Sequence, residues 1–406
     1  MPLTIKTELK NIEVQVEQNE SDKSLFNLNL GELGSTQIEY PLETNGHFES
    51  IENYDIYLFK NRFGNLQRDI FQVSIKSCKI AWVLPLSIYN KDFSEFLADN
   101  TTASKKIDIF LKFAAYPAFH KLLLAEDIAS KTPEYNSDYY KLSDFYDPET
   151  KVLIVSKKEL ESSNIVFDIN RYLPSLYKYG YVLLNSDEKK FYNIDTSNTN
   201  ENVFLKDKKI FDKIEIYSLA SDLLTEKYVI ELFRNVLKMK LHPLIRFHFL
   251  YQVIELLINK IGITHYKKEL QKKINDDLKN SYSSSFENLI SGNFQSVNEI
   301  KEYSQKIDVI FKSLNYQTNE EDRIKMLFNC SKIKNNGYQN LLACSKTITG
   351  MTENDLNKNI YKVRNALVHS YHDLYKKDIK IDEKIQELNT EFEYMIVDIL
   401  KEYSYQ

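Results

Sequence analysis

The chain has 406 residues, a formal net charge of −5 and 43% hydrophobic residues, values typical of a globular protein long enough for two domains. Glycine and proline are scarce, at 9 and 8 residues, which excludes a collagen-like or low-complexity chain. No apolar run reaches the roughly 18 residues that cross a bilayer, and no secretory signal opens the sequence, so we expect a cytoplasmic protein.

The first half of the chain alternates apolar and polar residues, the pattern of half-buried strands. Strands are predicted at residues 3–5, 12–16, 71–75, 80–84, 152–155, 165–169, 179–184 and 214–217. A helix is predicted over residues 105–129, with a break or kink at Pro117 near its middle. Residues 1–220 are therefore predicted to form a mixed α/β or β-rich domain.

From about Ser218 the apolar period changes to 3.6 residues, the period of amphipathic helices. Helices are predicted at residues 221–240, 244–261, 264–280, 295–315, 319–333, 353–375 and 380–404. Residues 221–406 are thus predicted to form a helical bundle, which makes the chain an α+β protein. These two parts differ in charge: residues 226–406 carry 27 basic and 24 acidic side chains, and residues 1–225 carry 26 and 34.

The helix predicted at residues 353–375 combines a core-facing stripe with a polar face. Its predicted N-terminal cap is Thr352 or Asn354. The apolar stripe recurs at alternating spacings of four and three residues and comprises Leu356, Ile360, Val363, Leu367 and Leu374.

On the opposite face, Asn365, His369 and His372 are predicted within an arc of about 60°. Arg364 lies roughly 140° around the helix from His369 by the same geometry. Arginine and histidine therefore flank a groove, and a site of this form needs a second surface to close it.

These side chains suit the cleavage of RNA. The His369 imidazole can carry a proton to or from a ribose hydroxyl or a leaving 5′ oxygen. The Arg364 guanidinium can hold the scissile phosphate, and the Asn365 amide can position either group. No carboxylate cluster accompanies them, so we expect attack by the 2′-OH, a 2′,3′-cyclic phosphate product and no metal.

The stretch from Arg364 to Tyr371, RNALVHSY, resembles the Arg-x4–6-His signature of the HEPN superfamily, with Asn365 after the arginine. Tyr371 matches the extended Arg-x4-His-x-Tyr form of HEPN toxins from toxin–antitoxin systems. The resemblance covers this helix and, more loosely, the C-terminal helical region; it does not cover the N-terminal half. Domain order is also similar to that of ApeA-like defence proteins.

Membership of this superfamily implies a helical bundle that forms a homodimer and joins two motif helices into one metal-independent endoribonuclease site. It implies a role in antiviral defence, by abortive infection, or as a toxin. RNA is the implied partner, as single strands or tRNA loops, and a phage-derived trigger or an antitoxin is a further one. The N-terminal domain is then a sensor or a regulator.

The role of most supporting residues is open between alternatives. Glu255, a charge within an apolar helix, either orients Arg364 across the bundle, or it pairs with another helix or is partly exposed. Tyr371 contacts RNA, accepts a nucleotidyl group or packs at a dimer interface, and His372 either assists in the groove or is solvated. Lys376 and Lys377 are predicted to bind RNA phosphates.

Two other functions compete with the nuclease. One is a non-catalytic HEPN module for dimerisation or binding; the other is a HEPN toxin regulated by nucleotidylation of Tyr371. No GxxxxGK[ST] or GxGxxG motif occurs, and Gly31-x-x-Gly34 is the nearest approach to a glycine loop, so no cofactor is expected.

Overall fold

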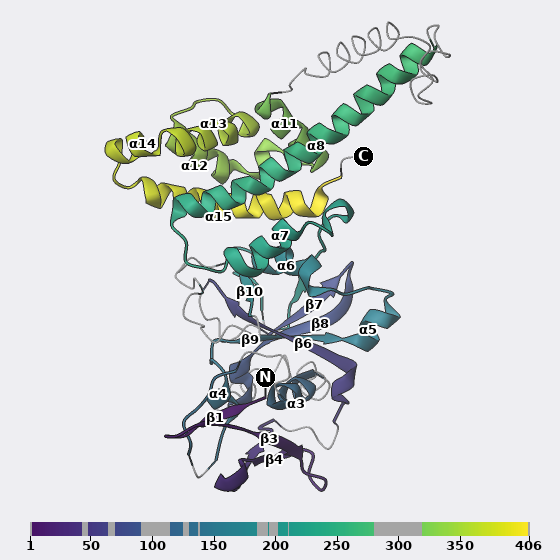
Figure 1. The fold of residues 1–406 in the computed structure, drawn as a ribbon, viewed down its shortest axis with the longest axis vertical. Coiled ribbons are helices and arrows are strands. Elements are labelled where there is room, and N and C mark those ends of the chain that lie inside the picture. Colours follow the sequence, from purple (N-terminus) through teal and green to yellow (C-terminus); the bar gives the residue numbers. More distant parts are fainter. Residues whose placement is uncertain are drawn as a thin grey trace, which may run out of the picture. The chain divides into compact units, whose positions relative to one another are not determined.

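The computed structural model describes two compact units (Figure 1). The described residues are 2–42, 48–63, 70–90, 114–124, 130–136, 139–184, 194, 202–209, 211–279 and 319–404. The first unit comprises residues 1–219 and 226–240, and the second comprises residues 220–225 and 241–406. The first is rich in strands and the second is helical, so the chain is an α+β protein.

The largest sheet of the first unit has six strands in the order β10-β6-β9-β8-β7-β11. Its strands are β6 (Tyr54–Asn61), β7 (Phe71–Ile75), β8 (Cys78–Pro85), β9 (Lys151–Ser156), β10 (Tyr181–Leu183) and β11 (Lys213–Glu215). Only β11 pairs in parallel, with β7; the other neighbours are antiparallel. The central strand β9 reads KVLIVS and buries its first five residues, as expected for a β-branched strand covered on both faces.

Two smaller antiparallel sheets are also present among the described residues of this unit. One contains β3 (Gln15–Gln18), β4 (Leu25–Asn29) and β5 (Ser35–Glu39). The other pairs β1 (Thr4–Lys6) with β2 (Asn11–Glu13). Side chains from all three sheets share one core with helix α3, and much of it is aromatic: Phe26, Tyr40, Tyr89, Tyr116 and Phe119.

Short helices surround these sheets. They are α3 (Tyr116–Leu124), α4 (Leu142–Phe145), α5 (Lys157–Ser162), α6 (Ile169–Lys178), α7 (Lys227–Glu231) and the π-helix η8 (Leu232–Val236). Among the residues of this unit that the structure describes, the 3₁₀ helices include η1 (Gly31–Leu33), η2 (Ile51–Asn53) and η3 (Leu86–Tyr89). Both α7 and η8 pack on α6.

The second unit is a bundle of helices (Figure 1). Its helices are α8 (Pro243–Lys279), α11 (Glu320–Cys330), α12 (Gln339–Thr349), α13 (Leu356–His369), α14 (Tyr371–Lys377) and α15 (Ile381–Glu402), with the 3₁₀ turns η7 (Ser221–Leu223) and η9 (Asn335–Gly337). Helix α8 packs on α11 and α15, and α12 packs on α13 and α15.

Several predicted strands are confirmed and others are wrong. Strands at 71–75, 80–84 and 152–155 are present as β7, β8 and β9. Residues 165–169 form no strand, because Asp168 caps α6 by accepting the N–H of Asn170. Strands β4, β5 and β6 were missed.

The predicted helices also need correction. Residues 221–240 do not form one helix of the C-terminal bundle: they divide between η7 in the second unit and α7 with η8 in the first. The helices predicted at 244–261 and 264–280 are one helix, α8, with Gly262 inside it. Helix α12 was missed.

Two predicted helices lie partly or wholly beyond what the structure describes. Of the helix predicted at 105–129, residues 105–113 and 125–129 lie outside the described residues. Pro117 is the second residue of α3, where the absence of its backbone N–H costs little stability. The helix predicted at 295–315 lies outside the described residues.

A buried ion pair joins α8 to α15 in the second unit. The Nε of Arg246 donates to Oε1 of Glu393 at 2.6 Å, and their side chains are 4% and 2% exposed. One turn of α15 earlier, the Asn389 amide donates to the carbonyl of Pro243 at 2.8 Å. These contacts fix the start of α8 against the middle of α15.

Replacing one partner of this pair is expected to destabilise the second unit by about 3–5 kcal/mol, because the remaining charge stays buried without its counter-ion. The variants are Arg246→Met and Glu393→Leu. The double variant removes both charges and is expected to recover most of the loss. Hydrogen exchange of the α8 and α15 amides at increasing urea concentration measures the free energy of unfolding of this unit separately from that of the first unit. Additive effects of the two substitutions would contradict the prediction.

Candidate functional site

Helix α13 carries the three predicted catalytic residues. Leu356, Ile360, Val363 and Leu367 are 0–1% exposed, as the apolar stripe predicts. The predicted caps, Thr352 and Asn354, are not used. Instead the side-chain oxygen of Asn335, which lies 21 positions earlier in the chain, accepts the N–H of Leu356 at 3.2 Å.

The helix is also tied at its start by a buried amide. Asn359 is 0% exposed, and its Nδ2 donates to the carbonyls of Glu353 and Asp355 at 3.0 and 2.7 Å. These bonds link the first turn of α13 to the segment that leads into it. The position of the motif is thus fixed by side chains outside the motif itself.

The motif helix ends at His369, so the prediction of one helix through Tyr375 is wrong. Ser370 adopts φ −131° and ψ 15°, and α14 begins at Tyr371. The sequence carried a signal for this break, because Ser370 and Asp373 have the spacing of a helix N-terminal capping pair. Arg364, Asn365 and His369 share α13, whereas Tyr371, His372, Lys376 and Lys377 belong to α14. Leu374 therefore does not extend the α13 stripe.

Arg364 is held from two sides. Its Nη1 donates to Oδ1 of Asn365 at 3.0 Å, and its Nη2 lies 3.4 Å from Oε1 of Glu255 on α8. The guanidinium carbon lies 5.9 Å from the centre of the Tyr251 ring. Its Nε is buried and meets no acceptor among the described residues. Of the five N–H donors of an arginine, one on Nη1 and one on Nη2 are thus left for a further acceptor.

Tyr251 connects this arginine to α11. It is 2% exposed, and its hydroxyl donates to Oε1 of Glu320, the first residue of α11, at 2.8 Å. Burial and the bond to the Glu320 carboxylate raise the pKa of Tyr251 well above its ordinary value. The phenol therefore stays protonated and fixes the ring beside Arg364.

His369 is the last residue of α13 and is exposed. Within the described part of the chain, no hydrogen bond or ion pair holds its imidazole. Five residues along a helix correspond to a rise of about 7.5 Å and a rotation of about 140° from Arg364. By ideal helix geometry, the arginine and the histidine therefore lie at separate points of the α13 surface.

Tyr371 forms a second polar group with residues that the sequence did not single out. Its hydroxyl donates to Oδ1 of Asp382 at 2.8 Å, and Nε2 of His242 lies 3.3 Å from Oδ2 of the same carboxylate. The rings of His242 and Tyr371 meet edge to face, with centroids 6.4 Å apart. Because Nδ1 of His242 accepts the N–H of Leu244, the proton of this ring is on Nε2, facing Asp382. Asp382 thus accepts from both neighbours.

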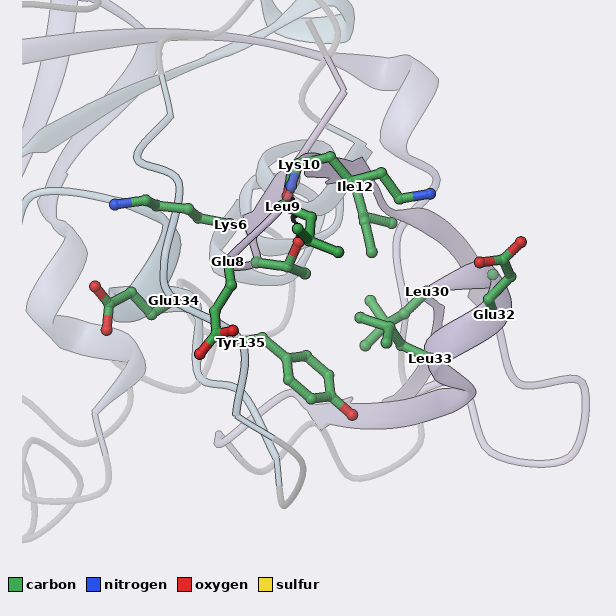
Figure 2. Close-up of a pocket in the computed structure, with 12 residues that line it drawn as sticks. Lys6, Glu8, Leu9, Lys10, Ile12, Leu30, Glu32, Leu33, Glu134 and Tyr135 are labelled. Carbon is green, nitrogen blue, oxygen red and sulfur yellow. Dashed lines mark hydrogen bonds between the residues drawn. The ribbon is translucent and has the colours of Figure 1, made fainter.

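The first unit contains an open pocket of about 1090 Å³ beside the β1–β2 hairpin. Leu30 and Leu33 face Tyr135 across it, and lysine and glutamate side chains surround the opening (Figure 2). Gly31, from the glycine pair noted in the sequence, lies in its lining, but with Gly34 it forms the turn between β4 and β5, and both have positive φ. Its lining mixes lysine and glutamate side chains, and none of the predicted catalytic residues lies among them.

Metal-ligand clusters and long apolar helices are both absent from the described ranges. There, no group of three or more His, Cys, Asp or Glu side chains is placed to hold a metal ion. Within the same ranges, none of the helices combines the length and apolar character that a bilayer-spanning segment requires.

Asp382→Asn is expected to lower the pKa of Tyr371. Burial first, and then the hydrogen bond to Asp382, raise this pKa to about 12. Removing the carboxylate charge moves it toward the ordinary value of about 10, while burial keeps it above that value. Selectively labelled tyrosine, followed by NMR against pH, measures the change, with Tyr371→Phe for assignment. Asp398→Asn, which alters the bond from Tyr338, is the matched control. An unchanged titration midpoint of Tyr371 would show that Asp382 does not affect the pKa of this tyrosine.

The candidate residues fall into two groups and a remainder. Arg364 meets Asn365 and Glu255, and Tyr371 meets Asp382 and His242, while His369, His372, Lys376 and Lys377 are exposed. Comparison of the chain with protein-family models, with curated proteins and with solved structures found no match. The function proposed below therefore rests on these side chains and on the motif that they form.

Proposed function

We propose that the C-terminal unit is a metal-independent endoribonuclease of the HEPN class. The observation that carries this proposal is the placement of Arg364, Asn365 and His369 on α13 of a helical unit. Arg364 is anchored by Glu255 but retains free donors, and the His369 imidazole is exposed. This combination supplies a phosphate clamp and a proton carrier on one element.

The reaction is a transesterification in which the 5′ hydroxyl leaves and a 2′,3′-cyclic phosphate forms. The ribose 2′ oxygen forms a bond to phosphorus while the bond from phosphorus to the 5′ oxygen breaks. One imidazole takes the proton of the 2′-OH, and the 5′ oxygen receives a proton from an acid. Arg364 stabilises the charge of the pentacovalent phosphate, and Asn365 keeps the guanidinium oriented.

A homodimer supplies the second half of this site. One exposed imidazole cannot be both base and acid in the same step, so a second α13 from a partner copy provides the other group. The N-terminal unit then serves as a sensor or regulator of the nuclease, in antiviral defence or in a toxin system. Its trigger is a phage component or an antitoxin.

The competing function is a non-catalytic HEPN module that dimerises or binds a partner. The nucleotidylated toxin is a variant of the nuclease in which Tyr371 accepts a nucleotidyl group. In support of that variant, the Tyr371 hydroxyl lies 2.8 Å from a carboxylate able to take its proton. A mass increase on Tyr371 after co-expression with a nucleotidyltransferase identifies it.

The central test is cleavage of total cellular RNA by the purified full chain in EDTA. The wild type is expected to cut and to leave 2′,3′-cyclic phosphate ends. His369→Ala is expected to lose about 10²- to 10⁴-fold in rate, since proton transfer contributes that much. Val368→Ala, at the neighbouring exposed position of α13, is the matched control and should cut like the wild type. Equal cutting by the His369 variant places the chemistry elsewhere, and no cutting by any variant favours the binding module.

Glu255→Gln tests the anchor of Arg364. Its side chain is 40% exposed and that of Arg364 is 25% exposed, so the free energy of unfolding should change by less than about 1 kcal/mol. The RNA cleavage rate is expected to fall about tenfold, because a misplaced phosphate clamp stabilises the transition state less. Steady-state kinetics should show this loss mainly in kcat. A loss confined to protein stability would make Glu255 a structural residue only.

A further inference from the structure

The β1–β2 hairpin of the first unit has one edge that the chain itself covers. Along the β1 edge, the N–H of Lys6 donates to the carbonyl of Pro133 at 2.7 Å, and the N–H of Tyr135 donates to the carbonyl of Lys6 at 2.8 Å. These bonds make the segment around residue 134 a short parallel partner of β1. The hairpin thus already pairs with an extended segment on one side.

The opposite edge, formed by β2, is open. On the β1 side of β2, the carbonyl of Lys10 accepts at 2.9 Å and the N–H of Val14 donates at 2.8 Å. Antiparallel pairing uses every second residue, so Asn11 and Glu13 turn their N–H and C=O groups away from β1. Both residues are exposed, and these backbone groups form no hydrogen bond within the part of the chain that the structure describes. An open edge of this kind pairs with another extended chain.

Further along the chain, β4 covers the same edge. The strand β3 follows β2 after Val14, and the odd-numbered residues of this stretch face β4, as Asn19 does when its N–H donates to the carbonyl of Leu25 at 2.9 Å. Strand β4 ends at Asn29, and Gly31, with a φ of 64°, turns the chain into η1. The edge of β2 is therefore left uncovered. The pocket of about 1090 Å³ lies between β2 and η1, since residues of both line it.

The interior of this pocket is apolar. Ile12 lines it from β2, and Leu30 and Leu33 face Tyr135 across it (Figure 2). Leu33 and Tyr135 are 38% and 39% exposed, and Leu9, in the turn of the hairpin, is 96% exposed. Large apolar side chains that gather at the surface mark a site of interaction. The pocket is large enough to receive an apolar side chain of a ligand that pairs with β2.

The charges around the opening favour a polypeptide over a polyanion. The charged side chains of the lining are Lys6, Glu8, Lys10, Glu32 and Glu134. None of them forms an ion pair with a residue of the described ranges. Glutamates outnumber lysines here, and residues 1–225 carry 34 acidic and 26 basic side chains. Nucleic acid and an acidic membrane are repelled by this balance, whereas a polypeptide supplies charges of either sign.

We infer that the open edge of β2 and the adjoining pocket bind an extended polypeptide of a partner protein, as a strand antiparallel to β2. The peptide residues opposite Glu13 and Asn11 form the backbone hydrogen bonds, and their side chains lie on the outer face. The residue between them stands opposite Ile12 and directs its side chain into the pocket. A basic side chain pairs best with Glu13. The recognised triplet is therefore basic, apolar and polar, in chain order.

This inference goes beyond the proposed nuclease. It assigns a ligand class to the first unit, and it holds whether or not the second unit cleaves RNA. Its test therefore uses the full-length protein without RNA, and peptide affinity is the quantity measured.

The probes are peptides selected from a displayed library of random heptapeptides on the immobilised wild-type protein. Enriched sequences are synthesised with blocked ends and a fluorophore, and their affinity is measured by fluorescence anisotropy. We expect the enriched peptides to share the basic–apolar–polar triplet. Selection that enriches no such triplet overturns the inference.

Backbone methylation of the peptide separates strand addition from simple apolar contact. An N-methyl group on the residue opposite Asn11 removes an N–H that points at β2, and it is expected to weaken binding by about tenfold. An N-methyl group on the apolar residue removes an N–H that points away from β2, and it should change the affinity by less than about twofold. Equal effects of the two methyl groups would contradict strand addition.

Two substitutions test the protein side. Leu33→Asp places a charge in the pocket and is expected to weaken binding by about tenfold or more. Its matched control is Val166→Asp, at a 76% exposed valine of the same unit. Glu13→Pro removes an outward N–H from β2 without breaking a bond to β1, and it is expected to weaken binding by about tenfold or more. Glu39→Pro makes the same change on the outer edge of β5 and is the control.

Far-UV circular dichroism of all four variants should match that of the wild type. Equal peptide affinity in the wild type, Leu33→Asp and Glu13→Pro overturns the inference. Binding of anionic vesicles in place of peptides assigns the surface to a membrane, and a dimer that Glu13→Pro dissociates assigns it to a second copy; either result overturns the inference. Failure of the wild type to cut RNA affects only the nuclease proposal.

Discussion

The ion pair between Arg246 and Glu393 sets the arrangement of the C-terminal unit. Two charges removed from water are tolerated only when each satisfies the other, so α8 and α15 have one register in which both helices are stable. The same start of α8 is held by Asn389 and, through His242, by Asp382. Because α8 also carries Glu255, the position of the motif arginine depends on this buried contact in another part of the bundle.

The two arginine–glutamate pairs of α8 differ in a way that matches their roles. The pair at Arg246 is short, at 2.6 Å, and almost fully buried. The pair at Arg364 is longer, at 3.4 Å, and both side chains reach solvent. A bond of that length and exposure is weak in water. Glu255 can therefore orient the guanidinium and still yield to a phosphate group, whereas Glu393 cannot be displaced.

Local patterns predicted the parts of this chain that local forces determine. The apolar stripe of α13 and strands β7, β8 and β9 follow from side-chain period alone. For Glu255 the sequence left the partner open, and the structure shows that it is Arg364, at a carboxylate that is 40% exposed. The cap that Asn335 provides and the bonds of Asp382 to His242 and Tyr371 could not be predicted from local patterns, because they join segments that are distant in the sequence. The division of residues 221–240 between the two units also depends on tertiary packing, which overrides an amphipathic pattern.

The turn at Ser370 has a consequence for how such a chain can diverge. In one continuous helix, a residue gained or lost would rotate everything after it by about 100°. Here the spacing from Arg364 to His369 is set within α13, and the next helix starts afresh at Tyr371. Related chains could therefore lengthen, shorten or replace α14 while keeping the same arginine-to-histidine geometry. The chemistry carried by α13 and the contacts made by α14 would then evolve independently of each other.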